Sequence, residues 1–202
     1  MAEMLPQRLP FGAMDTRASG WWAMIFTVFT EASLFAYLLF SYFYLAVQPH
    51  APGTFPEGGA PALGLAALNT AILLASSVAV GWAQLGIARG SRKRLVAGLG
   101  IGAVLGVIFL AIQGFEWAAK PFGLSSTPYS SLYFVVTGFH MAHVVVGVLM
   151  LLALTFWSAR GAFGRRRFAH IHIGALYWHF VDAVWLAVFF TFYLTPLLGL
   201  TS

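Results

Sequence analysis

The chain has 202 residues, of which 60% are apolar and only 8% are charged, and its mean hydropathy is +0.83. Soluble domains carry about 25% charged residues, so this composition excludes a soluble domain and indicates an integral membrane protein. The chain has no cysteine, which excludes disulfides, thiolate metal sites and haem attachment through a Cys-x-x-Cys-His motif.

Five apolar runs are each long enough to cross a bilayer, which takes about 20 residues. Their bounds are about 20–46, 63–88, 95–118, 129–157 and 171–197. The sequence therefore predicts an all-α integral membrane bundle of five transmembrane helices, forming one membrane domain over residues 1–202. The first run is longer than the apolar core of a secretory signal and no small-residue cleavage site follows it, so we expect a retained helix.

Basic residues concentrate on one side of the five predicted crossings, and Lys120 alone lies on the other side. Because Lys and Arg favour cytoplasmic loops, we predict a cytoplasmic N-terminus and an external C-terminus. The net charge of +5 resides in short loops at helix ends, where anionic lipid head groups are better partners than nucleic acid. We expect no nucleic-acid partner. The basic residues on the predicted cytoplasmic side are Arg8, Arg17, Arg89, Arg92, Lys93, Arg94, Arg160, Arg165, Arg166 and Arg167.

Local signals along the chain support these helices. The connection 47–62 holds four prolines and three glycines and is predicted to be an external loop. In the third run, Gly98, Gly102 and Gly106 recur every four residues, which favours close approach of a neighbouring helix. Thr127 followed by Pro128 is a typical start of a helix, with Thr as the cap and Pro in the first turn.

Two carboxyl groups fall inside predicted helices. Glu31 lies about eleven residues into the first one, which is roughly 16 Å deep and near the middle of the membrane. A carboxyl group at that depth is either protonated or held by a partner, so Glu31 is a candidate functional residue. Glu116, one turn after Gln113, is closer to the outer end of its helix, where a structural role is favoured.

Histidines form the other buried polar set. His140 and His143 stand one turn apart in the fourth predicted helix, and His179 precedes Asp182 by three residues in the fifth. Metal or haem binding by three histidines is one interpretation. The pattern equally indicates an interhelical hydrogen-bond network, in which His140 or His143 pairs with Glu31 or Glu116, and His179 with Asp182 forms a polar clamp. Bulky neighbours of His140 argue against a haem slot, and we predict no metal site.

These motifs together resemble subunit III of haem-copper cytochrome c oxidases, in order, from about residue 20 to residue 194. Glu31 matches the buried carboxylate of that family. The Tyr-Trp pair at 177–178 and the Asn-Thr pair at 69–70 favour the cytochrome c branch over the quinol oxidase branch. The segments that carry the resemblance are 29–35, 69–76, 113–116, 137–143 and 177–185.

The resemblance implies an accessory, non-redox subunit of a proton-pumping cytochrome c oxidase. Such a subunit packs against the catalytic haem-copper subunit I and the copper-bearing subunit II, holds phospholipid, and supports assembly and proton uptake of the catalytic subunit. Haems and copper are then expected in those partners and no cofactor in this chain. The implied location is the bacterial cytoplasmic membrane, which the chain crosses several times.

Departures from the family pattern are also informative. Many members have seven crossings, whereas this chain resembles their last five. His172 stands where the family usually has Glu, and Trp157 stands where it tends to have a basic residue. Arg160, one turn on, suits a lipid phosphate, so Arg160 and Trp157 are the predicted lipid-binding residues. Subunit III of a quinol oxidase and a small polytopic transporter are the alternative functions.

Overall fold

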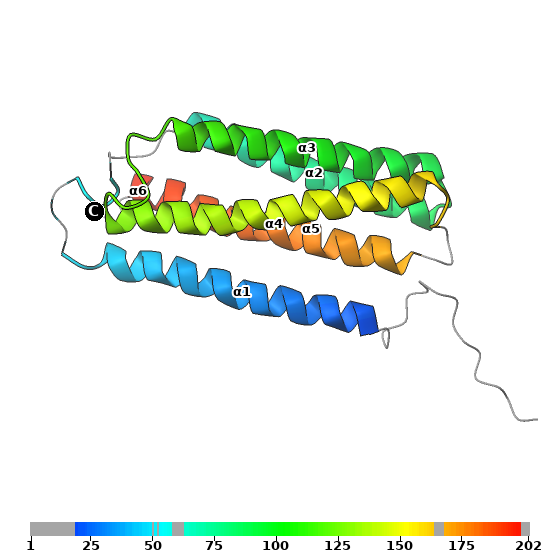
Figure 1. Cartoon of the computed structure of the whole chain (residues 1–202), viewed down its shortest axis with the longest axis horizontal. Coiled ribbons are helices and arrows are strands. Elements are labelled where there is room, and N and C mark those ends of the chain that lie inside the picture. Colours follow the sequence, from blue (N-terminus) through cyan, green and yellow to red (C-terminus); the bar gives the residue numbers. More distant parts are fainter. Residues whose placement is uncertain (1–18, 50, 52, 58–62, 164–167, 199–202) are drawn as a thin grey trace, which may run out of the picture.

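The computed structural model describes residues 19–49, 51, 53–57, 63–163 and 168–198. Five long helices run side by side along the long axis of the molecule (Figure 1). They are α1 (Ser19–Ala46), α2 (Leu63–Ala88), α3 (Arg92–Ala118), α4 (Pro128–Ala159) and α5 (Ala169–Phe189), and the last continues through η1 (Phe190–Leu194) into α6 (Thr195–Leu197).

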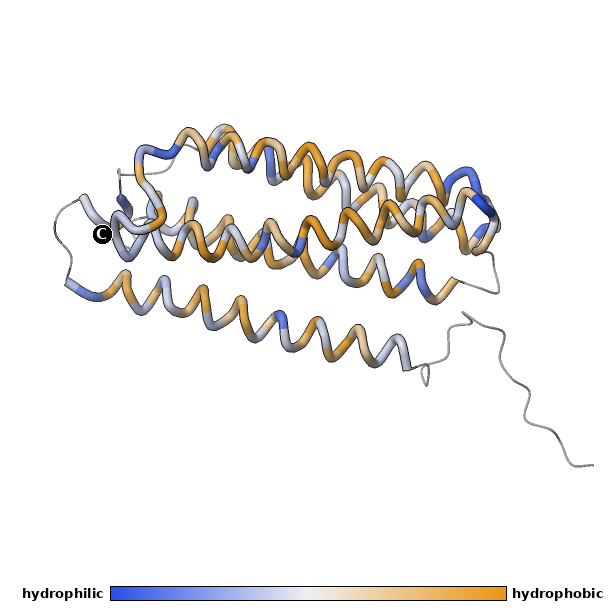
Figure 2. Tube along the Cα trace, in the orientation of Figure 1, coloured by the Kyte–Doolittle hydropathy of each residue, from blue (hydrophilic) through white to orange (hydrophobic). Residues whose placement is uncertain are grey.

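Each of the five is long and apolar enough to span a membrane, the last over Ala169–Leu197. Apolar residues occupy the middle of the helices and polar residues gather at their ends (Figure 2). The predicted all-α bundle of five membrane-length helices is confirmed for the part of the chain that the structure describes. The third helix begins at Arg92, earlier than the predicted 95, because its first turn carries basic residues that hydropathy alone assigns to a loop.

The basic residues of the described loops lie at one end of the bundle, where α2 meets α3 and where α4 ends, and Lys120 follows α3 at the other end (Figure 1). Arg8, Arg17, Arg165, Arg166 and Arg167, which also entered the orientation argument, lie outside the described residues. The predicted orientation of the termini therefore stays a prediction.

Close packing of α2 against α3 follows the glycine stripe, as predicted. A Cβ atom added at Gly98 would lie 2.6 Å from the carbonyl oxygen of Ala79, and one added at Gly102 would lie 2.7 Å from Val80 Cγ2. Real Cβ atoms do not approach other atoms so closely, so only glycine permits this separation.

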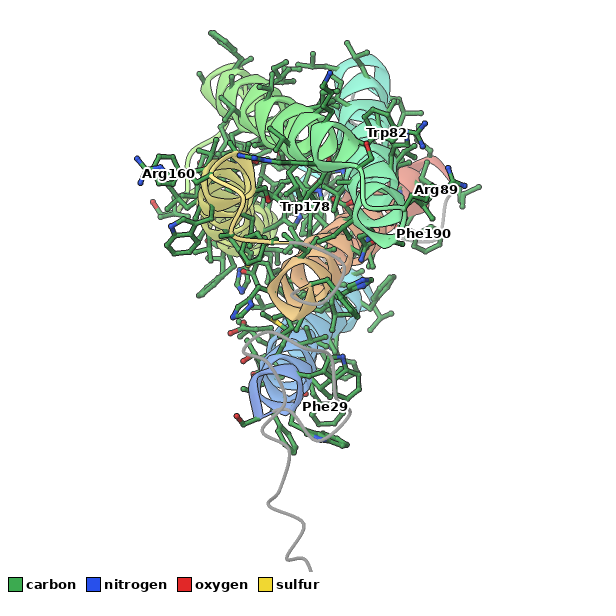
Figure 3. The ribbon with its side chains drawn as sticks, turned by 90° about the vertical axis from the view of Figure 1, so that its right-hand side faces the viewer. Phe29, Trp82, Arg89, Arg160, Trp178 and Phe190 are labelled. Carbon is green, nitrogen blue, oxygen red and sulfur yellow. The ribbon has the colours of Figure 1, made fainter. Side chains whose placement is uncertain are left out.

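Two tryptophans of α5 form the centre of the core. Trp178 and Trp185 are almost completely buried. The indole N–H of Trp178 donates to Ser76 Oγ at 3.0 Å, and that of Trp185 donates to Thr70 Oγ1 at 2.9 Å. Figure 3, which looks along the helices, places Trp178 in the middle of the bundle and Phe29 of α1 at its outer edge. These hydrogen bonds to α2 fix the rotation of α5 and hence the direction of its polar side chains.

The start of α4 is capped as the sequence indicates. The Thr127 side chain accepts from the Ser130 N–H at 3.2 Å, and the Ser130 side chain accepts from the Thr127 N–H at 2.9 Å. Pro128 occupies the first turn. The Thr127 hydroxyl also donates to Glu57 Oε2 at 2.6 Å, which attaches the connection between α1 and α2 to this helix end.

Candidate functional site

A carboxylate–imidazole bridge joins α1 to α4 near the middle of both helices. Glu31 Oε2 lies 2.9 Å from His143 Nε2, and His143 Nδ1 lies 2.7 Å from the carbonyl oxygen of Phe139. Because a carbonyl only accepts, Nδ1 carries a hydrogen and Nε2 shares one proton with Glu31. The bridge is satisfied either as a neutral acid with a neutral imidazole or as an ion pair. The Phe35 ring packs against the imidazole at 5.2 Å between centroids.

His140 has a different environment, although it lies one turn from His143. It is fully buried, and its Nε2–H donates to the carbonyl oxygen of Val181 at 3.2 Å. The ring centroids of Trp185 and Phe109 lie 4.8 and 5.7 Å from the centroid of the His140 imidazole. The structure thus brings His143, and not His140, to Glu31, and it brings neither histidine to Glu116. His140 instead ties α4 to the backbone of α5.

Glu116 lies in a cluster near the other end of the bundle. Its Oε1 accepts from the Tyr193 hydroxyl at 2.5 Å and from the Tyr133 hydroxyl at 3.4 Å, and it lies 3.1 Å from Lys120 Nζ. The ammonium group also sits over the Tyr133 ring, 4.9 Å from its centroid. This Glu116 cluster joins α3, α4 and η1 through one carboxylate oxygen, while Glu116 Oε2 has no hydrogen-bond partner among the described residues. That arrangement braces three elements.

Sequence reasoning missed the three partners of Glu116. The spacing of four residues between Glu116 and Lys120 is a usable signal, because such residues are neighbours on a helix. Tyr193 has no such signal. It faces inward because η1 is a π-helical turn, which inserts an extra residue and rotates the chain beyond it.

The polar residues of α5 face α2. His179 Nδ1 lies 2.5 Å from Ser77 Oγ, and His172 Nδ1 lies 3.3 Å from Gln84 Nε2. Asp182 is 4% exposed, and neither of its carboxyl oxygens has a hydrogen-bond partner among the described residues. His179 and Asp182 therefore do not bond to each other. His179 is directed at the contact between α2 and α5.

Trp157 and Arg160 lie at the end of α4, close to the other basic residues. Trp157 is 53% exposed, and the Arg160 guanidinium stacks on the Phe156 ring at 4.2 Å from its centroid. Figure 3 shows Arg160 on the outside of the bundle. The pair presents an aromatic ring and a cation on the surface expected to meet the membrane interface.

Within the described part of the chain, no three His, Asp or Glu side chains converge as metal ligands do. Each of the three predicted histidines has a ring nitrogen in a hydrogen bond, and His143 uses both. Apart from Asp182, the predicted polar residues of the helices thus form separate interhelical contacts, which hold helices together.

Similarity to known proteins points to one family. The family model for cytochrome c oxidase subunit III matches residues 15–196. Among curated proteins named cytochrome c oxidase subunit 3, the one from Pylaiella littoralis is 34% identical over 84% of this chain and 64% of its own length. Those from Bos taurus and Drosophila melanogaster are 34% and 32% identical, each over 85% of this chain and 68% of their own lengths.

The chain belongs to the cytochrome c oxidase subunit III family. The resemblance stated from the sequence motifs is confirmed, and neither a quinol oxidase subunit nor a transporter is favoured by the matches. This member of the subunit III family spans about two thirds of the length of the curated relatives that it matches. It is a membrane protein, and the residues that the structure describes include five helices long and apolar enough to span a membrane.

Proposed function

We propose that this chain is the accessory, non-redox subunit III of a haem-copper cytochrome c oxidase in a bacterial cytoplasmic membrane. It braces the assembly, retains phospholipid and supports proton uptake by the catalytic subunit. Family membership supports an oxidase complex as its setting. The proposed partners are the catalytic subunit I, which holds haem and copper, and the copper-bearing subunit II, so no cofactor is assigned to this chain.

The Glu31–His143 bridge carries this proposal. Within α1, which the structure describes completely, Phe35 and Tyr42 are the only buried residues. The rest of this helix presents large apolar side chains, such as Phe29 at 71% exposed, to whatever surrounds the chain. A helix with so little buried surface depends on its polar bridge for position, and the exposed aromatic face suits lipid chains or an apolar neighbouring subunit.

Trp157 and Arg160 supply the proposed head-group contact. A guanidinium binds phosphate with paired hydrogen bonds, and an exposed tryptophan is typical of the membrane interface. Both belong to the basic end of the bundle, which we place on the cytoplasmic side. The lipid is therefore bound with its phosphate at that surface and its chains along the exposed face of α4.

The test is replacement of Glu31 by Ala in the whole oxidase complex. The pair is partly buried, with the Glu31 side chain 31% exposed, and loss of a hydrogen-bonded partner costs up to about 1–3 kcal/mol, so α1 is expected to loosen. Mass spectrometry of the gently solubilised complex is expected to show reduced retention of this subunit and fewer bound phospholipids, while the haem absorption spectrum stays unchanged. Ser33→Ala is the matched control, because among the described residues the Ser33 hydroxyl bonds only to its own helix, at 2.9 Å from the carbonyl oxygen of Phe29.

Three outcomes contradict the proposal. Unchanged lipid content together with full subunit retention in Glu31→Ala would show that the bridge does not brace the assembly. A haem absorption band in the isolated wild-type chain would show that it carries a redox centre itself. If Arg160→Gln retains as much phospholipid as the wild type, the lipid phosphate is not held at the end of α4.

A further inference from the structure

One outward face of α5 carries a histidine at membrane depth. The exposed and partly exposed residues of this face follow at intervals of four and three, which is the spacing of a single helix face. His179 lies on it about one turn from the middle of the span Ala169–Leu197. It contacts Ser77, which lies near the middle of α2. The face consists of His172, Leu176, His179, Ala183, Leu186 and Phe190.

His179 uses only one of its two ring nitrogens within the chain. Nδ1 lies 2.5 Å from Ser77 Oγ, and Nε2 has no hydrogen-bond partner among the described residues. A neutral imidazole has a hydrogen on one nitrogen and a lone pair on the other, so Nε2 needs an acceptor or a donor in either form. Lipid chains offer neither, and a polar group left unpaired in hydrocarbon is strongly disfavoured.

The other outward surfaces at this depth differ from the α5 face. The hydroxyl groups of Thr30, Ser33 and Ser41 on α1 and of Thr155 on α4 each donate to a backbone carbonyl of their own helix. On α3, the outward residues over 96–115 are apolar throughout. Such surfaces suit lipid chains. The α5 face instead presents a ring nitrogen that cannot be satisfied from its own helix and requires a group from outside the chain.

Apolar side chains flank His179 on this side of the bundle. Val78, Trp82 and Phe190 are 73%, 42% and 45% exposed. Figure 3 places Trp82 and Phe190 on the same side of the molecule. Ala183, one turn after His179, is also exposed. Because its side chain is small, a helix from another chain can approach the imidazole closely there, as small residues allow at helix contacts in membranes.

A hydroxyl or amide side chain is the group that best meets His179 Nε2. Both groups donate and accept hydrogen bonds, so they match either form of the imidazole. They also avoid the cost of an ionised side chain in the middle of the membrane. A helix that carries one of these groups among apolar residues would fill the flanking surface and satisfy the ring nitrogen together.

We propose that this face of α5, together with Val78 and Trp82 of α2, is the docking surface for a membrane-spanning helix of another subunit, which places a hydroxyl or amide side chain opposite His179. We call it the α2–α5 docking face. The inference rests on the proposed function, because the oxidase complex supplies the partner. It goes beyond that function, since neither the Glu31–His143 bridge nor the lipid contact at Arg160 belongs to this surface.

Photocross-linking in the purified complex tests the docking face. A benzophenone-bearing amino acid replaces Val78 in one variant and Leu186 in another, and mass spectrometry identifies the adducts after irradiation. We expect both probes to attach to peptides of one other membrane-spanning subunit. Val104 is the matched control, because it is a valine near the middle of α3 and is 58% exposed among apolar neighbours. A probe at that position is expected to attach to lipid.

Two substitutions of His179 distinguish docking from a role inside the chain. In His179→Asn the amide reaches the position of Nδ1 and keeps a partner for Ser77, whereas in His179→Gln it reaches the position of Nε2. We expect the dissociation constant of this subunit from the complex to rise about 10-fold in His179→Asn, as for one lost hydrogen bond, and to stay close to the wild type in His179→Gln. A role confined to the Ser77 contact predicts the opposite order.

Three results would overturn the proposal. They are attachment of both probes to lipid alone, attachment to a second copy of this chain, and easier release of the subunit in His179→Gln than in His179→Asn. The adducts also separate this proposal from the proposed function. Lipid adducts alone leave the oxidase setting intact, whereas an adduct with a membrane-spanning chain of a different complex supports the docking face and refutes that setting.

Discussion

Replacing Gly147 by Ala is expected to destabilise the bundle, although alanine is the better helix former. A Cβ atom at this position would lie 2.7 and 2.8 Å from Cε3 and Cζ3 of Trp178, against about 3.5–4.0 Å for carbon atoms in good contact. The indole cannot move away, because Gly106 of α3 lies close against another edge of the ring, where an added Cβ atom would be only 2.7 Å from Cη2. The indole N–H is also held by its hydrogen bond to Ser76 Oγ. Overpacking of this kind costs about 1–3 kcal/mol.

Thermal unfolding of the solubilised complex measures the effect. For a chain of this size, the midpoint falls by about 2–4 °C for each kcal/mol lost. Gly81→Ala is the matched control, since nothing lies within 4 Å of a Cβ atom there, and it should stabilise by up to about 1 kcal/mol. Adding Trp178→Phe to Gly147→Ala removes the clashing ring edge and should recover about 1 kcal/mol in a double-mutant cycle. Equal melting of Gly147→Ala and Gly81→Ala would show that the bundle accommodates the added methyl group beside Trp178 without cost.

Two further sites lie at the end of the bundle that carries Lys120, and the same thermal measurement applies to both. Tyr193→Phe should cost about 1–3 kcal/mol, because it removes the 2.5 Å hydrogen bond to the buried Glu116. Tyr133→Phe should cost less, because its bond to Glu116 is 3.4 Å long and either variant loses the 3.1 Å contact between the two tyrosine hydroxyls. The reverse order would show that distance to Glu116 does not rank these two donors. Thr127→Ala should cost about 1 kcal/mol through loss of the α4 cap, and Thr127→Ser, which keeps a hydroxyl, should recover most of it. Equal melting of the Ala and Ser variants would contradict the capping role.

The helices and their local signals could be predicted from the sequence because they depend on neighbouring residues. Apolar runs of about 20 residues set the five spans, and the Thr127–Pro128 pair set the start of α4. The stripe at Gly98 and Gly102 predicted close packing of a neighbouring helix but could not identify that helix as α2. Small residues indicate that some helix approaches closely, without indicating which one.

The partners within the polar contacts could not be predicted in the same way. His140 and His143 are three residues apart, so their side chains differ by only about 60° around α4. Whether His140 or His143 meets Glu31 depends on the rotation of α4 about its own axis relative to α1. That rotation is set by the packing of α4 against all of its neighbouring helices. The inward position of Tyr193 could not be predicted for a related reason. The π-helical turn η1 changes the helical register, so a prediction that assumes 3.6 residues per turn assigns its residues to the wrong face.

Because α1 buries few side chains against the other helices, this subunit is expected to unfold in more than one step. Four helices share the tryptophan core, whereas the first is held by a few side chains along one edge. Regions with few buried contacts open at a lower free energy than the whole fold. Detachment of α1 and melting of the other four are therefore separate transitions, and no single midpoint describes both. Hydrogen exchange resolved by peptide is expected to show loss of protection of the α1 amides while the amides of the other four helices stay protected.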